Sequence, residues 1–130
     1  MRPQILTVDD ARTVRLIAER ALAAYDCDVN EATNGFNALF AMEKVLPDLV
    51  LLDVSMPVMG GLELLTMMRS NPALRKIPVL MLTSPADHAV RPQIEELGVS
   101  GILMKPFNEV TLVEKIRGVI SLNLRKTKLG

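Results

Sequence analysis

The sequence predicts an α/β domain in which a doubly wound, five-stranded parallel sheet carries helices on both faces. Two observations lead to this fold class. Short apolar runs alternate five times with longer segments of helical period, and the run LVLLD at 49–53 is apolar up to its last residue. Such alternation implies right-handed crossovers between parallel strands, and a continuously apolar strand is typical of one buried on both faces. The 130 residues, 49% of them hydrophobic, suffice for one domain with a sizeable core.

The first half of the chain is expected to form three strands and two helices. The run ILTV at 5–8 indicates a buried strand, and residues 14–25 then carry apolar side chains at helical spacing. A weaker strand is expected at 29–32 and a second helix at 35–46. A Pro-Asp pair ends that helix before the central strand.

The second half is expected to add two strands and three helices. The loop at 56–61 leads into a helix that ends near Ser70, and strands are expected at 77–82 and 101–104. Asn108 is the expected N-cap of the last helix. That helix presents one apolar face, made of Leu112, Val113, Ile116, Val119 and Ile120.

The fourth helix has a strong start signal and an interruption. Ser84 supplies an N-cap hydroxyl, Pro85 follows at the first helical position, and Asp87 places a carboxylate at the third. Pro92 falls inside the expected helix, where proline removes a hydrogen bond. We therefore predict either a kink or a helix that restarts near Arg91.

Composition narrows the class of protein. Fifteen basic residues balance fifteen acidic ones, which argues against a nucleic-acid or membrane-surface protein. Cys27 is the only cysteine, so no internal disulfide can form, which suits a reducing cytoplasm. No apolar stretch approaches the roughly 20 residues of a membrane span, and the N-terminus lacks the apolar region of a signal peptide. We expect a soluble cytoplasmic protein.

Polar residues that could bind a ligand or take part in a reaction lie where the predicted strands end. Asp9 and Asp10 follow the first strand, Asp53 ends the third, Thr83 ends the fourth, and Lys105 follows the fifth. The ligand site of such a sheet lies beyond the carboxyl ends of its strands. Three clustered carboxylates repel one another unless a cation joins them, and oxygen ligation suits Mg²⁺. A carboxylate can also accept a phosphoryl group, whose oxygens a lysine and a hydroxyl can then bind.

Each residue also has an ordinary structural interpretation. Asp10 could be the N-cap of the first helix, and Asp53 could be a turn residue that ends its strand. Thr83 or Ser84 could merely cap the fourth helix, and Lys105 with the following proline could be a plain loop pair. The functional interpretation rests on all of them occurring together at one rim.

Four motifs together resemble the receiver domains of response regulators, including stand-alone chemotaxis-type receivers. They are VDD at 8–10, LLDVSMP at 51–57, LTS at 82–84 and KPF at 105–107, in this order and with the family's spacing. The resemblance runs from about residue 4 to residue 120. It implies a flavodoxin-like fold with strand order 2-1-3-4-5 and five helices.

The resemblance also implies roles for individual residues. Asp53 would be the phosphoacceptor and Asp10 a direct Mg²⁺ ligand, with Asp9 holding the metal largely through water. The backbone carbonyl of Ser55 would complete the protein's share of the ligands. Thr83 and Lys105 would act as catalytic and switch residues.

Two further positions near the end of the fifth strand follow from the resemblance. Lys105-Pro106 is a candidate cis peptide, since only X–Pro bonds adopt cis readily. Ile102 stands where the family usually has a switch aromatic, three residues before the lysine.

The resemblance implies a signalling switch in a two-component system rather than an enzyme, apart from catalysis of its own phosphoryl transfer and slow dephosphorylation. A histidine kinase would be the phosphodonor, and a downstream target protein would read the face formed by the fourth helix, fifth strand and fifth helix. The protein would be a monomer or a phosphorylation-dependent homodimer. We expect the receiver domain at 1–122 and a short, basic, solvated tail at 123–130, with Arg125, Lys126 and Lys128.

Three other functions share parts of this pattern. A flavodoxin-like FMN carrier would need a Ser/Thr/Gly-rich phosphate loop after the first strand, where this chain has DDAR at 9–12. A haloacid-dehalogenase-type phosphatase would have an Asp-x-Asp pattern there, whereas these acids are adjacent. A pseudo-receiver would dock to a partner without being phosphorylated, and only an assay separates it from the main interpretation, because the acidic set is complete.

Overall fold

The computed structural model describes residues 2–126 and contains one sheet with the strand order β2-β1-β3-β4-β5, all parallel. The strands are β1 (Gln4–Val8), β2 (Asp28–Ala32), β3 (Leu49–Asp53), β4 (Val79–Thr83) and β5 (Gly101–Met104). The helices are α1 (Arg12–Leu22), α2 (Gly35–Lys44), α3 (Gly61–Ser70), α4 (Arg91–Leu97) and α5 (Glu109–Arg117), with the 3₁₀ helix η1 (Pro85–Val90) before α4. The predicted fold class and strand order are confirmed. Within this range no helix has the length and apolar character that a membrane crossing requires.

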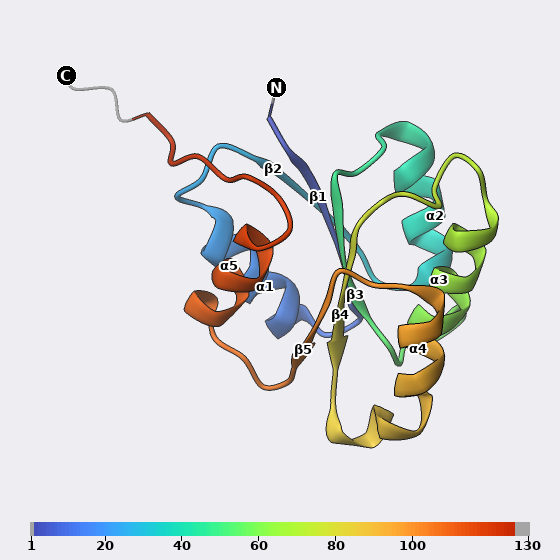
Figure 1. The fold of residues 1–130 in the computed structure, drawn as a ribbon. Coiled ribbons are helices and arrows are strands. Elements are labelled where there is room, and N and C mark those ends of the chain that lie inside the picture. The colour runs from blue at the N-terminus through green and yellow to red at the C-terminus, as the bar shows by residue number, and fades with distance from the viewer. Residues whose placement is uncertain (1, 127–130) are drawn as a thin grey trace.

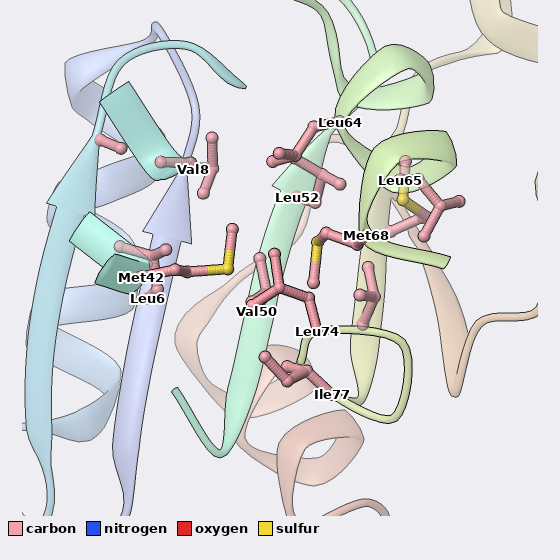
Figure 2. Packing of buried hydrophobic residues seen from close by; sticks show 14 of the residues in the cluster. Leu6, Val8, Met42, Val50, Leu52, Leu64, Leu65, Met68, Leu74 and Ile77 are labelled. Atoms are coloured by element: carbon pink, nitrogen blue, oxygen red, sulfur yellow. The ribbon is translucent and has the colours of Figure 1, made fainter. Parts of the chain in front are cut away.

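Helices cover both faces of the sheet, α1 and α5 on one and α2, α3 and α4 on the other (Figure 1). Because successive side chains of a strand point to opposite faces, each face buries its own apolar cluster. Figure 2 shows the cluster under α2 and α3, where strand residues pack with Met42, Leu64, Leu65 and Met68. The cluster under α1 and α5 includes Ile5, Leu49, Leu51, Leu80 and Ile116. Every side chain of β3 is buried, as its apolar run predicts.

Four elements stop or begin short of their apolar patterns: α1 ends at Leu22 and α2 at Lys44, before the expected residues 25 and 46, and β4 and α5 are also shorter. β4 begins at Val79, because the N–H of Ile77 bonds within a preceding turn and Pro78 has no N–H to give. α5 ends at Arg117, where Gly118 takes the C-cap position and its N–H bonds back to the carbonyls of the last turn. The apolar residues just beyond this cap still pack against the core.

The fourth helix restarts at Arg91, as one of the two predicted outcomes for Pro92. Ser84 and Asp87 form the predicted capping box, but the segment they begin is the 3₁₀ helix η1. The α-helical turns start only at Arg91, so Pro92 lies in the first turn of α4. At that place a proline removes no helical hydrogen bond, because the first N–H groups of a helix have no partner within it.

The segment at 123–125 is exposed, as the prediction of a solvated tail expects, but its backbone is hydrogen-bonded to the loop after α1. Asn123 accepts a hydrogen bond from the N–H of Asp26 at 2.7 Å. The N–H of Arg125 donates to the carbonyl of Ala24, and its guanidinium donates to the carbonyl of Ala23, both at 2.9 Å. An antiparallel bridge joins Tyr25 and Leu124. Lys128, the last basic residue of the predicted tail, lies outside the described residues.

Candidate functional site

Three carboxylates meet at the carboxyl ends of β1 and β3. Asp9 and Asp10 directly follow β1, and Asp53 is the last residue of β3. One carboxylate oxygen from each of them lies within 4.8 Å of the others. Asp9 and Asp53 are buried, whereas Asp10 is exposed. The acids thus gather at one rim, as the geometry of a parallel sheet predicts.

The loop after β1 fixes Asp9 and leaves the carboxylate of Asp10 without a capping role. The N-cap of α1 is Ala11, and no side chain caps this helix. Instead, Oδ1 of Asp9 accepts a hydrogen bond from the N–H of Ala11 at 2.8 Å. The guanidinium of Arg15 reaches back to the Asp9 carbonyl at 2.8 Å. The interpretation of Asp10 as an N-cap is therefore wrong.

Lys105 joins the two buried carboxylates. Its ammonium donates to Oδ2 of Asp9 at 2.8 Å and to Oδ1 of Asp53 at 2.9 Å. The backbone supports this position, because the N–H of Lys105 bonds to the Thr83 carbonyl at 2.7 Å. The Lys105-Pro106 peptide bond is cis, as predicted. Lys105 is consequently part of the acidic site and not of an ordinary loop.

The site holds more negative charge than its lysine can balance. The pKa of the Asp53 carboxyl is raised from 3.8 to about 6. Burial is the largest cause, the hydrogen bond from Lys105 opposes the rise, and the charges of Asp9 and Asp10 contribute to it. Burial lowers the pKa of the Lys105 ammonium, but its hydrogen bonds to Asp9 and Asp53 outweigh burial, so its pKa rises overall. One ammonium thus faces three carboxylates.

This set of donors fits a hard divalent cation. The three side chains offer only carboxylate oxygens, and the exposed Asp10 leaves one side of the cluster open to water. Mg²⁺ is usually bound in this way, by few carboxylates and several waters. A second positive charge would also relieve the repulsion among the carboxylates. The backbone carbonyl of Ser55, two residues beyond the end of β3, remains a predicted ligand.

The hydroxyl of Thr83 faces a residue that the sequence analysis did not single out. Thr83 ends β4, is 5% exposed, and its Oγ1 lies 3.9 Å from the sulfur of Met104. Ile102, the predicted switch residue, instead packs against the apolar cluster under α2 to α4. The parallel register pairs Thr83 with Met104 and Met81 with Ile102. Only knowledge of this register could have identified Met104.

Asp87 links the loop after β3 to the start of η1. Its Oδ2 accepts hydrogen bonds from the Ser84 N–H at 2.8 Å and the Ser84 hydroxyl at 3.1 Å. Its Oδ1 accepts a hydrogen bond from the Ser55 hydroxyl at 3.3 Å. The capping box was visible in the sequence, but the contact with Ser55 depends on the tertiary fold. Asp87 therefore connects the segment after the acidic site to the segment after Thr83.

Gly61 holds the loop after β3 against the acidic site. A Cβ at this position would overlap the backbone carbonyl oxygen of Asp53. The Gly61 N–H donates to the Val54 carbonyl at 2.8 Å and so brings α3 close to the end of β3. A glycine is required here for a close backbone approach, not for an unusual φ.

Comparison with known proteins agrees with this geometry. The family model of the response regulator receiver domain matches residues 5–117. The chain is 37% identical over 114 residues to chemotaxis protein CheY-3 of Vibrio cholerae, covering 87% of this chain and 88% of that protein. It is 36% identical to response regulator PleD of Caulobacter vibrioides over 125 residues, covering 95% of this chain. The structure of chemotaxis response regulator CheY4 of Vibrio cholerae matches with a TM-score of 0.84 at 31% identity, covering 92% of this chain and 100% of that one.

These matches differ in how much of each relative they cover. The chain spans only 27% of PleD, so that match concerns one part of a longer protein. The matches to CheY-3 and CheY4 cover most or all of those proteins. The fold, the residues at the strand ends and the family match agree, and the chain belongs to the response regulator receiver domains, which serve phosphorylation-dependent signalling in two-component systems.

Proposed function

We propose that the chain is a signalling switch in which Asp53 accepts a phosphoryl group from a histidine kinase while Mg²⁺ is bound. One observation carries the proposal: a buried carboxylate at the end of the central strand shares a lysine with a second buried carboxylate, beside a third that is exposed. Each of these groups has a part in phosphoryl transfer to a carboxylate.

The hydrogen bonds favour Asp53 as the acceptor over Asp9. Both carboxylate oxygens of Asp9 are engaged, one by the Ala11 N–H and the other by Lys105, and the residue is 0% exposed. Within residues 2–126, a hydrogen bond reaches Oδ1 of Asp53 but not its Oδ2. A carboxylate with one oxygen held and the other free is oriented for attack on phosphorus.

The remaining groups neutralise charge and orient the acceptor. Asp9, Asp10 and Asp53, with the Ser55 carbonyl, would hold Mg²⁺, which when bound neutralises charge on the transferred oxygens. In the transfer, a bond forms between Oδ2 of Asp53 and phosphorus as the bond from phosphorus to the imidazole nitrogen of the donor breaks. Lys105 then exchanges its hydrogen bond with Asp53 for one with a phosphoryl oxygen.

Phosphorylation would change the side of the rim that carries Thr83. The Asp53 side chain goes from one negative charge to about two and gains acceptor oxygens, by analogy with other phosphorylated residues. Thr83 would be drawn toward those oxygens, and η1 and α4 follow it in the chain. A target protein would read the resulting shift between two arrangements of the surface formed by α4, β5 and α5. We propose that the protein acts in the cytoplasm, as a monomer or as a homodimer formed on phosphorylation.

Incorporation of phosphoryl from acetyl phosphate, followed by mass spectrometry, tests the proposal. We expect one adduct on Asp53 that requires Mg²⁺, and none in Asp53→Asn. Asp48→Asn is a matched control, because Asp48 precedes the opposite end of the same strand. An adduct that persists in Asp53→Asn would contradict the assignment of the acceptor. If no adduct forms and Mg²⁺ does not bind, the chain acts as a pseudo-receiver that docks without phosphorylation.

A further inference from the structure

The hydroxyl of Thr83 has a weak partner in this structure. Its Oγ1 lies 3.9 Å from the thioether sulfur of Met104, and a thioether is a poor acceptor of hydrogen bonds. A hydrogen bond to a charged phosphoryl oxygen would be roughly twice as strong as one to a neutral acceptor. The contact between Thr83 and Met104 is thus one that phosphorylation of Asp53 would readily break.

Met104 reaches from this buried contact to the surface. Thr83 is 5% exposed, whereas Met104 is 45% exposed although the two residues are paired neighbours in β4 and β5. A cavity of about 220 Å³ lies beside it, lined by Thr83, Ser84, Pro85, Asp87, His88, Arg91 and Met104. Because methionine is unbranched and has three rotatable side-chain bonds, its side chain can turn into such a space. Met104 therefore has both a contact with the switch hydroxyl and room to move.

Ile102 lacks these properties. It lies on the same face of β5 as Met104 but two residues earlier, which is roughly 7 Å farther from the strand end. It packs against the buried cluster under α2 to α4 and is not among the residues that line the cavity. A β-branched side chain is also restricted at χ1, so it moves less readily between two positions.

We infer that Met104, and not Ile102, carries the change at Thr83 to the surface formed by η1, α4 and β5. The inference rests on the proposed function, because Thr83 must have a phosphoryl oxygen to move to. Before phosphorylation the Met104 sulfur stays against the Thr83 hydroxyl. After phosphorylation the hydroxyl donates to a phosphoryl oxygen. The released Met104 side chain then takes a second position, which differs in how far it enters the adjacent cavity. Met104 is a positioning residue of the switch and does not contact the reacting atoms.

Methyl NMR of the full chain labelled with [methyl-¹³C]methionine tests this inference. Beryllofluoride with Mg²⁺ serves as the probe, since it mimics a phosphoryl group on a carboxylate, and ¹⁹F NMR reports independently whether it binds. The Met104 methyl signal is assigned by its loss in Met104→Leu, a change that conserves volume. We expect this signal to shift when beryllofluoride binds. Met67 on α3 is a matched control, because it too is 45% exposed, and its methyl signal should stay in place.

Substitutions at Thr83 separate coupling from general structural change. In Thr83→Val, which keeps the shape but lacks the hydroxyl, the Met104 signal should no longer respond although ¹⁹F NMR still shows bound beryllofluoride. Thr83→Ser should restore the response. If beryllofluoride binds the unmodified protein while the Met104 signal stays unmoved, the inference is wrong. It is also wrong if, in a second sample labelled at the isoleucine methyl groups, the Ile102 signal shifts while that of Met104 does not. Failure of beryllofluoride to bind would instead overturn the proposed function, and with it the inference.

Discussion

The two halves of the strand-end rim are held by interactions of different strength. On the side of β1 and β3, an ammonium makes ionic hydrogen bonds of 2.8 and 2.9 Å to two buried carboxylates. On the side of β4 and β5, the hydroxyl of Thr83 has a sulfur at 3.9 Å, and the following helix is divided into η1 and α4. The first half, the acidic half, is thus held by strong ionic contacts, and the second, the Thr83 half, by a weak one.

This difference explains which residues follow the family pattern. Under the proposed function, the acidic half must present charges in one fixed geometry, and its acids and its lysine do stand where the resemblance places them. Under the same proposal, the Thr83 half needs only two arrangements of similar free energy, which many side chains can provide. The Thr83 half contains Ile102, which stands in place of an aromatic residue, and Pro92 at the start of α4.

Gly61→Ala should have the largest effect on stability, because it changes the packing of the acidic half. Its Cβ would overlap the carbonyl oxygen of Asp53, which belongs to the backbone of the central strand and has little room to shift. We expect a loss of about 3 kcal/mol in the free energy of unfolding, measured by urea denaturation. Gly118→Ala is the control, since its Cβ would meet its nearest neighbour only at 3.4 Å. Equal stability of the two variants would contradict a tightly packed acidic half.

Lys105→Ala should be the next most damaging change. It leaves the buried carboxylates of Asp9 and Asp53 without a positive partner, at a cost of about 2 kcal/mol, reduced from the figure for fully buried pairs because the Lys105 side chain is 23% exposed. Mg²⁺ should restore part of the lost stability, since it supplies positive charge to the same carboxylates. Lys115→Ala, on an exposed face of α5, should change stability by less than about 0.5 kcal/mol and gain nothing from Mg²⁺.

Asp53→Asn should make the Mg²⁺-free protein more stable, with a defined pH dependence. Asp53 has a pKa of about 6 in the folded protein against 3.8 ordinarily, so between these values the folded state binds more protons than the unfolded state. The stability of the unmodified protein therefore falls as pH rises through this window and stays lower above it. Asparagine removes this titration, so its advantage should grow up to about pH 6 and then level off.

The stability advantage of Asp53→Asn has a defined expected size. It should reach on the order of 1 kcal/mol, because the variant escapes a buried charge but loses the ionic hydrogen bond with Lys105. Urea denaturation at a series of pH values measures it. Saturating Mg²⁺ should reverse the order, because it stabilises the protein that binds it. An advantage that grows toward low pH would have the wrong sign.

Asp87→Ala should have the smallest effect on the free energy of unfolding of the whole protein, because it acts on the Thr83 half, whose contacts are already weak. It removes the capping box of η1 and the contact with Ser55, at a cost of roughly 0.5 kcal/mol. Its local effect should be larger than its global one, and amide hydrogen exchange should accelerate through η1 while β3 stays protected. Ser55→Ala removes only the cross-loop contact and should leave the exchange of η1 nearly unchanged.

The fold and the acidic half were predictable because both follow from local sequence. The apolar runs identify the strands, and strand ends in a parallel sheet meet at one rim, so the order of residues along the chain is enough to group Asp9, Asp10, Asp53 and Lys105. The interruption at Pro92 was predictable for a similar reason, since proline acts on its own backbone.

The remaining features depend on register and on tertiary contact. Met104 is opposite Thr83 only because β4 and β5 pair in one particular register. The contact from Asp87 to Ser55 and the binding of Arg125 to the end of α1 join segments far apart in the chain. No local pattern marks such pairs. The basic residues near the C-terminus are exposed, as predicted, but nothing in the sequence shows that the backbone there is also hydrogen-bonded.

The docked segment at 123–125 determines what intrinsic fluorescence can report on this protein. The chain has no tryptophan and a single tyrosine, Tyr25, which forms the bridge to Leu124. Tyr25 lies just past the far end of α1, an 11-residue helix about 16 Å long whose other end adjoins the acidic site. Tyrosine emission would therefore follow release of this segment and would be a poor optical signal for Mg²⁺ or phosphoryl binding.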